Sequence, residues 1–322
     1  MKSDIAVSYV GVDVAKATLQ VHCLGRQCEV DNTPRSHTKL CKTLKSIPAV
    51  HVVCEATGGY ESVIVRALHK AAIPVSVVNP ARVRAAANAL GQMAKTDRID
   101  ARLLTVFGER FEPAPTPEVS PVQAQLRALT QWLKQLVDAQ MVAKTQAEHH
   151  EEPFVIKQRK TLVSHYESQI KKVEAQLQAL MDKDQDLRQR AECLDAIKGV
   201  GIRTALLMLA HMPELGQLNR GQVAALAGLA PWTRESGAMK GLRIIGGGRP
   251  EVRTTLYMAA LAASSSNAVL REFYERLVKK GKLKKVALTA VMRKLLVHMN
   301  QKLKALAIHS TLAEINEQTV KK

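Results

Sequence analysis

Apolar and polar positions alternate along the first 112 residues in a way that predicts a mixed sheet. Two alternating stretches, 6–14 and 18–24, predict paired strands around a turn at Ala15 and Lys16. The apolar, β-branched run 49–55 is typical of a buried central strand. Three strands followed by alternating strands and helices predict an α/β fold. The other expected elements are strands near 27–30 and at 74–79, and helices from TGGY (57–60) to about 70, from Pro80 to about 90, and from Thr96 onward.

A proline-rich segment separates this α/β part from the rest of the chain. EPAPTPEVSP (112–121) contains four prolines in ten residues, and each lacks an amide donor and disfavours helix before it. Beyond it, leucines at helical spacing predict two long helices, from 122 to about 150 and from 154 to about 190, which would form a helical hairpin or coiled-coil arm. The expected parts are the α/β domain 1–112, the linker 113–121, the arm 122–190 and a mainly helical part, 191–322.

The composition of the chain points to a polyanionic partner. Among 322 residues, Lys and Arg number 47 against 29 Asp and Glu, which gives a formal net charge of +18. Such a balance favours nucleic acid or an anionic membrane surface. No stretch approaches the roughly 20 apolar residues of a membrane-spanning helix, so the membrane is the weaker candidate. Aromatic residues make up only 3%, which argues against recognition by bases stacked on aromatic rings.

Cysteine usage and the first residues indicate a cytoplasmic protein. The five cysteines are odd in number and contain no CxxC pair, which argues against a zinc site and against a disulfide framework. An acidic residue, Asp4, precedes the first strand-like pattern directly, so we expect no signal peptide.

Four acidic residues of the α/β part are candidates for one metal site. Asp13 lies in the first predicted strand, Glu55 ends the central strand, and Asp97 and Asp100 lie three apart on one face of a helix. Each alone is compatible with a cap or a solvated end, although a buried carboxylate is costly unless it is paired or metal-bound. Together they would repel one another unless a cation neutralised them. Oxygen ligands suit Mg²⁺ or Mn²⁺, and such ions serve phosphoryl transfer.

Three strings carry these acids: GVDVAK (11–16), CEATGGY (54–60) and KTDRIDARLL (95–104). They resemble the Asp–Glu–Asp–Asp quartet of RuvC-like, RNase H-fold domains. Their wording, above all KTDxxDA, resembles the DEDD transposases of a bacterial insertion-sequence family, which are recombinases guided by a bridge RNA and relatives of Piv-type DNA invertases. The resemblance implies an RNase H-like domain. Its catalytic metal, Mg²⁺ or Mn²⁺, would be bound by Asp13, Glu55, Asp97 and Asp100.

A glycine-containing segment in the last third resembles a helix-hairpin-helix module. In KGVGIRTALLMLAHM (198–212), Gly199 and Gly201 would allow a tight turn. Exposed amides at the start of the next helix would then hold a DNA phosphate without reading sequence. A GxG between helices is also compatible with an ordinary helix-breaking turn.

Ser236 lies in a predicted turn within the unusually glycine-rich and basic stretch 226–261. Cationic side chains would favour the serine alkoxide and bind a scissile phosphate, and bare glycine amides would hold further phosphate oxygens. From the residues alone, a phosphate-binding loop with a bystander serine stays an alternative. The stretch contains neither a Walker A loop nor a GxSxG elbow. The candidate phosphate ligands are Lys240, Arg243, Arg249, Arg253 and the amides of Gly246, Gly247 and Gly248.

The string SGAMKGLRIIGGGRPEVRTTLY, which begins at Ser236, resembles the C-terminal transposase domain of the same family, whose serine attacks DNA. One extra glycine precedes Arg249. By this resemblance Ser236 is the nucleophile that forms a phosphoserine link to the cut strand. The resemblance further implies double-stranded donor and target DNA, a structured guide RNA, and a homodimer or homotetramer in which two protomers complete one site.

Three other functions are compatible with these residues. A Piv-type invertase would use the same groups. A RuvC-like junction nuclease would use the carboxylates to activate water, and Ser236 would only bind phosphate. An architectural protein would bind DNA by charge alone. The segment 276–304 contains ten Lys or Arg and no acidic residue, which fits a solvated helix face and phosphate contacts equally well.

Overall fold

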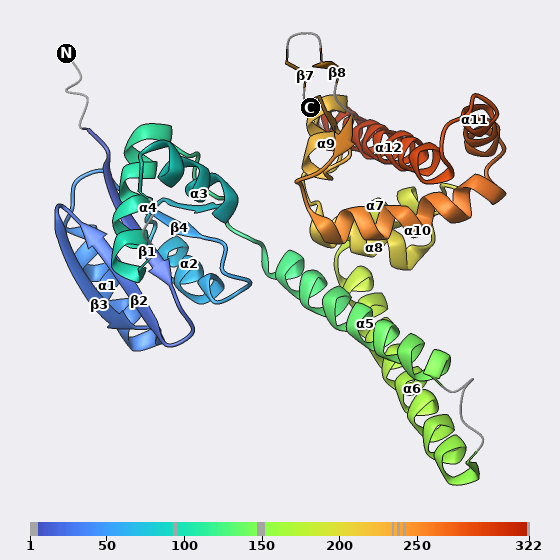
Figure 1. The fold of residues 1–322 in the computed structure, drawn as a ribbon, viewed down its shortest axis with the longest axis horizontal. Coiled ribbons are helices and arrows are strands. Elements are labelled where there is room, and N and C mark those ends of the chain that lie inside the picture. Colours follow the sequence, from blue (N-terminus) through green and yellow to red (C-terminus); the bar gives the residue numbers. More distant parts are fainter. Residues whose placement is uncertain are drawn as a thin grey trace. The chain divides into compact units, whose positions relative to one another are not determined.

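A computed structural model describes residues 6–92, 96–146, 152–233, 235–236, 239–240 and 243–320. Within these ranges, the side chains of Asp97, Ser236 and Lys240 lie outside the description. The chain divides into two compact units, Met1–Val119 and Ser120–Lys322. Figure 1 shows the sheet and its helices in the first unit and an almost entirely helical second unit. The boundary falls inside the proline-rich segment.

A five-stranded sheet forms the centre of the first unit, and it confirms the predicted mixed α/β arrangement. The strands lie in the order β3-β2-β1-β4-β5. β2 runs antiparallel to both β1 and β3, whereas β1, β4 and β5 run parallel to one another. Their bounds are β1 (Ser8–Val14), β2 (Thr18–Cys23), β3 (Arg26–Asp31), β4 (Val50–Glu55) and β5 (Val75–Val78).

Four helices pack against the two faces of this sheet. On one face, Val10 and Val12 of β1 share a core with Leu40 and Leu68, which belong to α1 (Pro34–Lys45) and α2 (Glu61–Lys70). On the other face, Val53 of β4 shares a core with α3 (Pro80–Ala89) and α4 (Asp97–Phe111). Because successive residues of a strand point to opposite faces, the odd-numbered residues of β1 face α4.

Two local signals explain where helices of this unit begin. Thr96 caps α4 as expected, since its side chain accepts a hydrogen bond from the Ile99 amide at 3.4 Å. Helix α1 is an addition to the predicted elements. Its sequence is mostly polar, but Thr33 caps it by accepting from the Ser36 amide, and Pro34 occupies its first position.

The second unit begins with two long helices that pack side by side (Figure 1), α5 (Pro121–Gln146) and α6 (Pro153–Lys183). Their shared apolar seam includes Leu133 and Leu177. The expectation of a continuous helix to about 190 is wrong, because α6 ends at Lys183. Asp184 adopts an extended conformation there, and its carboxylate caps the next helix by accepting from the Leu187 amide at 2.8 Å.

The remaining helices gather around one apolar core, to which Leu206, Leu256 and Leu295 contribute. Among the described residues of this unit, four two-residue strands form two small ladders, β6 with β9 and β7 with β8. None of the helices in the described ranges has a stretch long and apolar enough to cross a membrane. The bounds are α7 (Gln185–Asp195), α8 (Ile202–His211), α9 (Arg220–Leu226), β6 (Pro231–Trp232), β7 (Glu235–Ser236), β8 (Met239–Lys240), β9 (Ile244–Ile245), α10 (Pro250–Ser266), α11 (Ala268–Lys279) and α12 (Lys284–Val320).

Candidate active site

Helix α4 lies directly on strand β1 because two glycines remove side chains from the contact. A methyl group on Gly11 would overlap the Ala101 carbonyl oxygen and would come within 2.7 Å of the Thr105 amide. Gly108 packs in the same way against the ring of Tyr9. Thr105 adds a polar contact, because its hydroxyl accepts from the Gly11 amide at 2.9 Å. The helix therefore runs antiparallel to the strand at close range.

This register brings the start of α4 to the end of β1. Gly108 meets Tyr9, and Ala101 and Thr105 meet Gly11. Two further residues along the strand, about 6.6 Å, correspond to about four residues of helix. Asp13 therefore lies beside the first turn of α4, which begins at Asp97.

Glu55 reaches the same place from the neighbouring strand. β1 and β4 are parallel, with Val12 paired to Cys54, and the next residues along both strands are Asp13 and Glu55. Neighbouring strands are about 4.8 Å apart, and residues in register point to the same face. Since Gly11 and Val53 face α4 and α3, Asp13 and Glu55 also lie on that face, at the carboxyl ends of their strands.

The first turn of α4 supplies the other two acids. The Asp100 side chain is largely buried, and its Oδ1 lies 4.0 Å from Nη2 of Arg84 on α3. The backbone thus places all four predicted acids at one edge of the sheet. Among the described side chains, no three Asp, Glu, His or Cys lie close enough together to hold a metal ion. The Asp97 side chain is not among these described side chains. Carboxylate oxygens are the donors that Mg²⁺ and Mn²⁺ prefer, so the four acids suit either ion.

The loop after Glu55 is held by a residue of the following helix. Glu61 accepts hydrogen bonds through Oε2 from the amide and hydroxyl of Thr57 at 3.1 and 3.0 Å, and from the Gly59 amide at 2.9 Å. Gly58 and Gly59 have positive φ angles of 75° and 118°. Glu61 therefore fixes the TGGY turn beside the candidate metal site, a role that sequence reasoning missed.

A polar row continues from the acids across the sheet. Asp13 pairs with Gln20 on β2, and Gln20 pairs with Glu29 on β3. Nε2 of Gln20 donates a hydrogen bond to Oε2 of Glu29. Sequence reasoning also missed these two residues, although their positions in alternating strands mark them as members of the same face.

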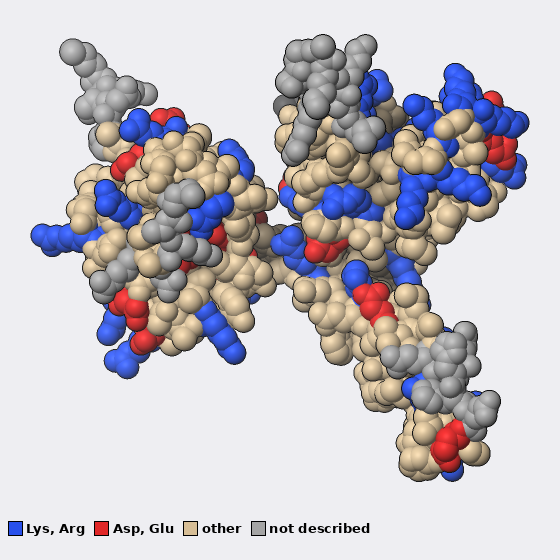
Figure 2. All heavy atoms as spheres, viewed as in Figure 1, with Lys and Arg blue, Asp and Glu red and all other residues tan. Residues whose placement is uncertain are grey.

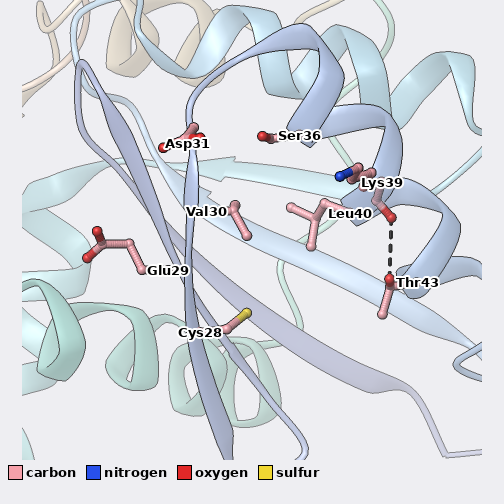
Figure 3. A pocket seen from close by; sticks show the side chains of 8 residues that line it. All are labelled: Cys28, Glu29, Val30, Asp31, Ser36, Lys39, Leu40 and Thr43. Carbon is pink, nitrogen blue, oxygen red and sulfur yellow. Dashed lines mark hydrogen bonds between the residues drawn. The ribbon is translucent and has the colours of Figure 1, made fainter.

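A separate hollow of about 390 Å³ lies on the opposite face, between β3 and α1. Figure 3 shows Val30 and Leu40 pointing toward each other inside it, whereas Glu29 points away. The Thr43 hydroxyl makes a hydrogen bond within its own helix, since it donates to the Lys39 carbonyl at 3.3 Å. Because this hollow is on the α1 face, it is separated from the four acids by the sheet.

In the second unit, the two hairpin glycines have different roles. Gly199 has a φ of +96°, and a side chain there would come within 2.7 Å of the Ala263 amide, so it allows both the turn and close packing on α10. Gly201 is the N-cap residue of α8 with a φ of −92°, which any residue adopts. Nothing lies within 4 Å of the position that a side chain on Gly201 would occupy.

Ser236 lies between β6 and β9, in a segment with short antiparallel strand pairs that we call the Ser236 excursion. Trp232 pairs with Ile244 at its base, and Ser236 pairs with Met239 further along. Residues 237–238 between these partners lie outside the described residues. The indole nitrogen of Trp232 donates to the Gly246 carbonyl at 3.3 Å, which braces the base of the excursion.

Two of the predicted phosphate ligands hold the protein's own groups in this structure. Arg249 donates to both carboxylate oxygens of Glu214, at 2.6 and 2.8 Å, and to the His211 carbonyl at 2.7 Å. Burial, the largest single cause, opposes ionisation of Glu214. The hydrogen bonds and charge of Arg249, a backbone hydrogen bond and the charge of Arg127 together outweigh it and hold the pKa of Glu214 below its ordinary value. Arg253 donates to the Gly247 carbonyl at 2.8 Å. Arg243 is exposed.

Glycines join the loop before α10 to the loop after α9. Gly228, Gly247 and Gly248 all have positive φ angles, and a side chain on Gly248 would overlap the Gly228 amide. The Arg249 amide donates to the Leu226 carbonyl at 2.9 Å. The base of the Ser236 excursion is therefore tied to α9 and α10 through backbone contacts that leave no room for side chains.

Family models match both units of the chain. Residues 10–150 match the IS110 DEDD model, described as a transposase. Residues 191–275 match the model described as the transposase IS116/IS110/IS902 family. The two matches contain the four acids and Ser236, respectively.

Individual proteins are similar over different lengths. Pilin gene-inverting proteins of Moraxella lacunata and Moraxella bovis are each 28% identical over 303 residues, which cover 90% of this chain and 93% of the relative. An uncharacterized 43.6 kDa protein of insertion element IS110 from Streptomyces coelicolor is 28% identical over 123 residues, 38% of this chain and 29% of that protein. Among solved structures, Thermus thermophilus RuvC in complex with a Holliday junction substrate aligns with a TM-score of 0.27 and 14% identity, covering 34% of this chain and all of RuvC.

Proposed function

The chain carries domains of the IS110 transposase family and is an enzyme of the DNA recombinase and transposase class. From this premise we propose that it cuts and rejoins DNA through Ser236 and a carboxylate-bound metal ion. The observation that carries the proposal is the convergence of Asp13, Glu55 and the first turn of α4 at one edge of the sheet.

The first unit would act as an RNase H-like, RuvC-like metal-binding domain. In support, its strand order is β3-β2-β1-β4-β5 with only β2 running in the opposite direction. Asp13, Glu55, Asp97 and Asp100 would bind Mg²⁺ or Mn²⁺. When bound, the metal supplies positive charge that orients and polarises a scissile phosphate. The close packing at Gly11 would keep the strand and helix ligands at a constant distance.

Ser236 would carry the covalent step. Its hydroxyl loses a proton as Oγ forms a bond to phosphorus, and one phosphodiester oxygen leaves as a strand-end hydroxyl. Rejoining reverses this step, because a strand-end hydroxyl attacks the phosphoserine and releases the serine. The number of phosphoester bonds is unchanged throughout, so the exchange needs no nucleotide. Lys240, Arg243 and the amides of the Gly246–Gly248 run would bind the phosphate.

Trapping a protein–DNA adduct on a denaturing gel tests this chemistry. The wild-type protein, Ser236→Ala and Asp13→Asn are incubated with Mg²⁺, DNA carrying the joined ends of the element, and RNA from its flanking region. We expect an adduct with wild type only. Exposed residues supply matched controls, Ser266→Ala on α10 and Asp138→Asn on α5, which should retain the adduct. Free cut ends without an adduct, still formed by Ser236→Ala, would instead indicate a metal-dependent nuclease.

Site-specific inversion is the second candidate function. The pilin gene-inverting relatives align over 93% of their length, which favours it. The same residues would serve both reactions, so the substrate distinguishes them. Plasmids with two recombination sites in inverted orientation would show a flipped segment with an invertase, whereas a transposase would move the element to a new target.

A guide RNA and an oligomeric assembly complete the proposal. The formal net charge of +18 supports binding of both RNA and double-stranded DNA. Removal of the RNA should abolish target choice but leave non-specific DNA binding. Mixing Ser236→Ala with Asp13→Asn protein tests assembly, because restored adduct formation requires a dimer or tetramer in which one protomer supplies the serine and another the carboxylates.

A further inference from the structure

Five exposed lysines surround the turn between α11 and α12 in the second unit. Figure 2 shows Lys and Arg side chains gathered on the surface around α11. The turn lies beyond residue 275, where the family match of this unit ends. We call this surface the lysine turn, and its residues are Lys279, Lys280, Lys282, Lys284 and Lys285.

The backbone of the lysine turn has a defined conformation. The amides of Lys280, Gly281 and Lys282 donate to carbonyls in the last turns of α11, at 2.9 to 3.1 Å. Gly281 has a φ of +77°, the left-handed conformation that commonly ends a helix. The five lysines are therefore presented from a closed turn.

Packing against the core holds the turn's framework in place. Leu270 buries α11 in the apolar core of the unit, and Phe273 packs against the same core. The Lys294 ammonium of α12 lies 4.5 Å from the Phe273 ring centroid, and the Arg276 guanidinium lies 5.5 Å from it. The Lys294 contact links the two helices that flank the turn, whereas the Arg276 contact lies within α11.

The positive charge here is not neutralised within the described part of the unit. From 276 to 304 the sequence has ten Lys or Arg and no acidic residue, and none of the ten makes an ion pair among the described residues. The acids nearest in sequence are Glu272 and Glu275 on α11. Lys284 and Lys285 also stand in the first turn of α12, where the helix dipole disfavours cations. A bound anion would relieve both repulsions.

We propose that the lysine turn binds the phosphate backbone of duplex DNA outside the reacting site. Several closely spaced cations suit a polymer with a phosphate at regular intervals. Phe273 and Tyr274 are partly buried in the core, so the turn offers no aromatic platform for unpaired bases. Such contacts fix the position of DNA without reading its sequence. The proposal goes beyond strand exchange, since it requires neither Ser236 nor the carboxylates.

Salt-dependent binding of a labelled duplex of about 30 base pairs tests the proposal. Measurements in EDTA exclude a metal contribution. Replacing all five lysines of the turn by Gln should weaken binding at least about tenfold near 0.1 M salt, and should reduce the slope of log K against log salt by about 0.9 for each lost phosphate contact. Replacing the same five by Arg should keep both values close to wild type.

A matched control separates the effect of the lysine turn on DNA binding from the effect of total charge. The five lysines of α6 are equally exposed, and their replacement by Gln removes the same charge. Equal losses in both Gln variants would overturn the proposal, as would loss of duplex RNA binding with unchanged DNA binding. Duplex binding in EDTA needs neither the metal nor the covalent step, so failure of strand exchange leaves this test intact. The control residues are Lys157, Lys160, Lys171, Lys172 and Lys183.

Discussion

The carbonyl oxygen of Ala101 occupies the space that a side chain on Gly11 would need. This contact joins the middle of β1 to α4 in the second turn of the helix. Asp13 is two residues along the strand, and Asp100 is adjacent to Ala101 in the helix. Gly11, which has no side chain, therefore sets the distance between the acids of the strand and the acids of the helix.

Gly11→Ala should destabilise the first unit and weaken strand cleavage together. The added methyl group forces α4 away from β1, and overpacking of this kind costs about 1–3 kcal/mol. Hydrogen exchange of β1 and β4 peptides would report the lower stability of this unit. Gly221→Ala on α9 is the control, since its φ is not positive and no atom lies closer than 3.4 Å to its side-chain position. Unchanged exchange in Gly11→Ala would contradict the packing argument.

Much of the sheet and the position of the acids could be predicted because both depend on local signals. Alternation identified β1 and β2, a continuous apolar, β-branched run identified β4, and Thr96 identified the start of α4. The parallel pairing of two strands that each end in an acid then brings Asp13 and Glu55 together. These are consequences of period-two geometry and need no knowledge of side-chain contacts.

Other features could not be predicted, because they depend on contacts between distant parts of the chain. Arg249 looked like a phosphate ligand among other cations, but its partner Glu214 is 35 residues away in sequence. Arg84 meets Asp100 only once α3 packs on α4. The break at Asp184 was hidden because an aspartate in an amphipathic pattern is also compatible with a solvated helix position.

Arg84→Gln should lower the Mg²⁺ concentration needed for strand cleavage. The guanidinium is 4.0 Å from Asp100 and competes electrostatically with a bound cation. Solvent screens this partly exposed group, so we expect a shift of about threefold. Mg²⁺ titration of cleavage and Mn²⁺ binding measured by electron paramagnetic resonance would both report it. Arg82→Gln is the matched control, because Arg82 on the same helix packs over Phe107. A higher Mg²⁺ requirement in Arg84→Gln would contradict the prediction.

The first unit should lose stability as the pH falls below about 6.5. Burial is the main cause that lowers the pKa values of His22, His37 and His51 from their ordinary value of 6.5. The folded state then keeps these rings neutral while the unfolded chain binds protons, so the stabilisation is present above 6.5 and is lost below it. Hydrogen exchange of this unit between about pH 7.5 and 5.5 would show the trend. His37→Gln should reduce the slope, and an undiminished slope would exclude His37 as a contributor.

The Glu214–Arg249 pair should stabilise the loop before α10 in a pH-dependent way. Burial raises the pKa of Glu214, but the hydrogen bonds and charge of Arg249, together with a backbone hydrogen bond and the charge of Arg127, hold it below the ordinary value of 4.5. As the pH falls, the unfolded chain therefore binds a proton at Glu214 before the folded chain does. The stabilisation is complete above about pH 4.5 and is lost as the pH falls through the lower pKa of the folded state. Both side chains are about one third exposed, so we expect Glu214→Gln to cost about 1 kcal/mol near pH 7.

A double-mutant cycle with Glu214→Gln and Arg249→Gln isolates this interaction, with unfolding of the second unit measured by hydrogen exchange of α8 and α10 peptides. The coupling free energy should be largest near pH 7 and should decrease as the pH falls through the lowered folded pKa of Glu214. Arg249→Lys should recover only part of it, because an ammonium cannot reproduce the two-pronged contact with both carboxylate oxygens and also reach the His211 carbonyl. A coupling that stays constant as the pH falls until Glu214 is protonated would show that Arg249 acts through packing and not through the charge of Glu214.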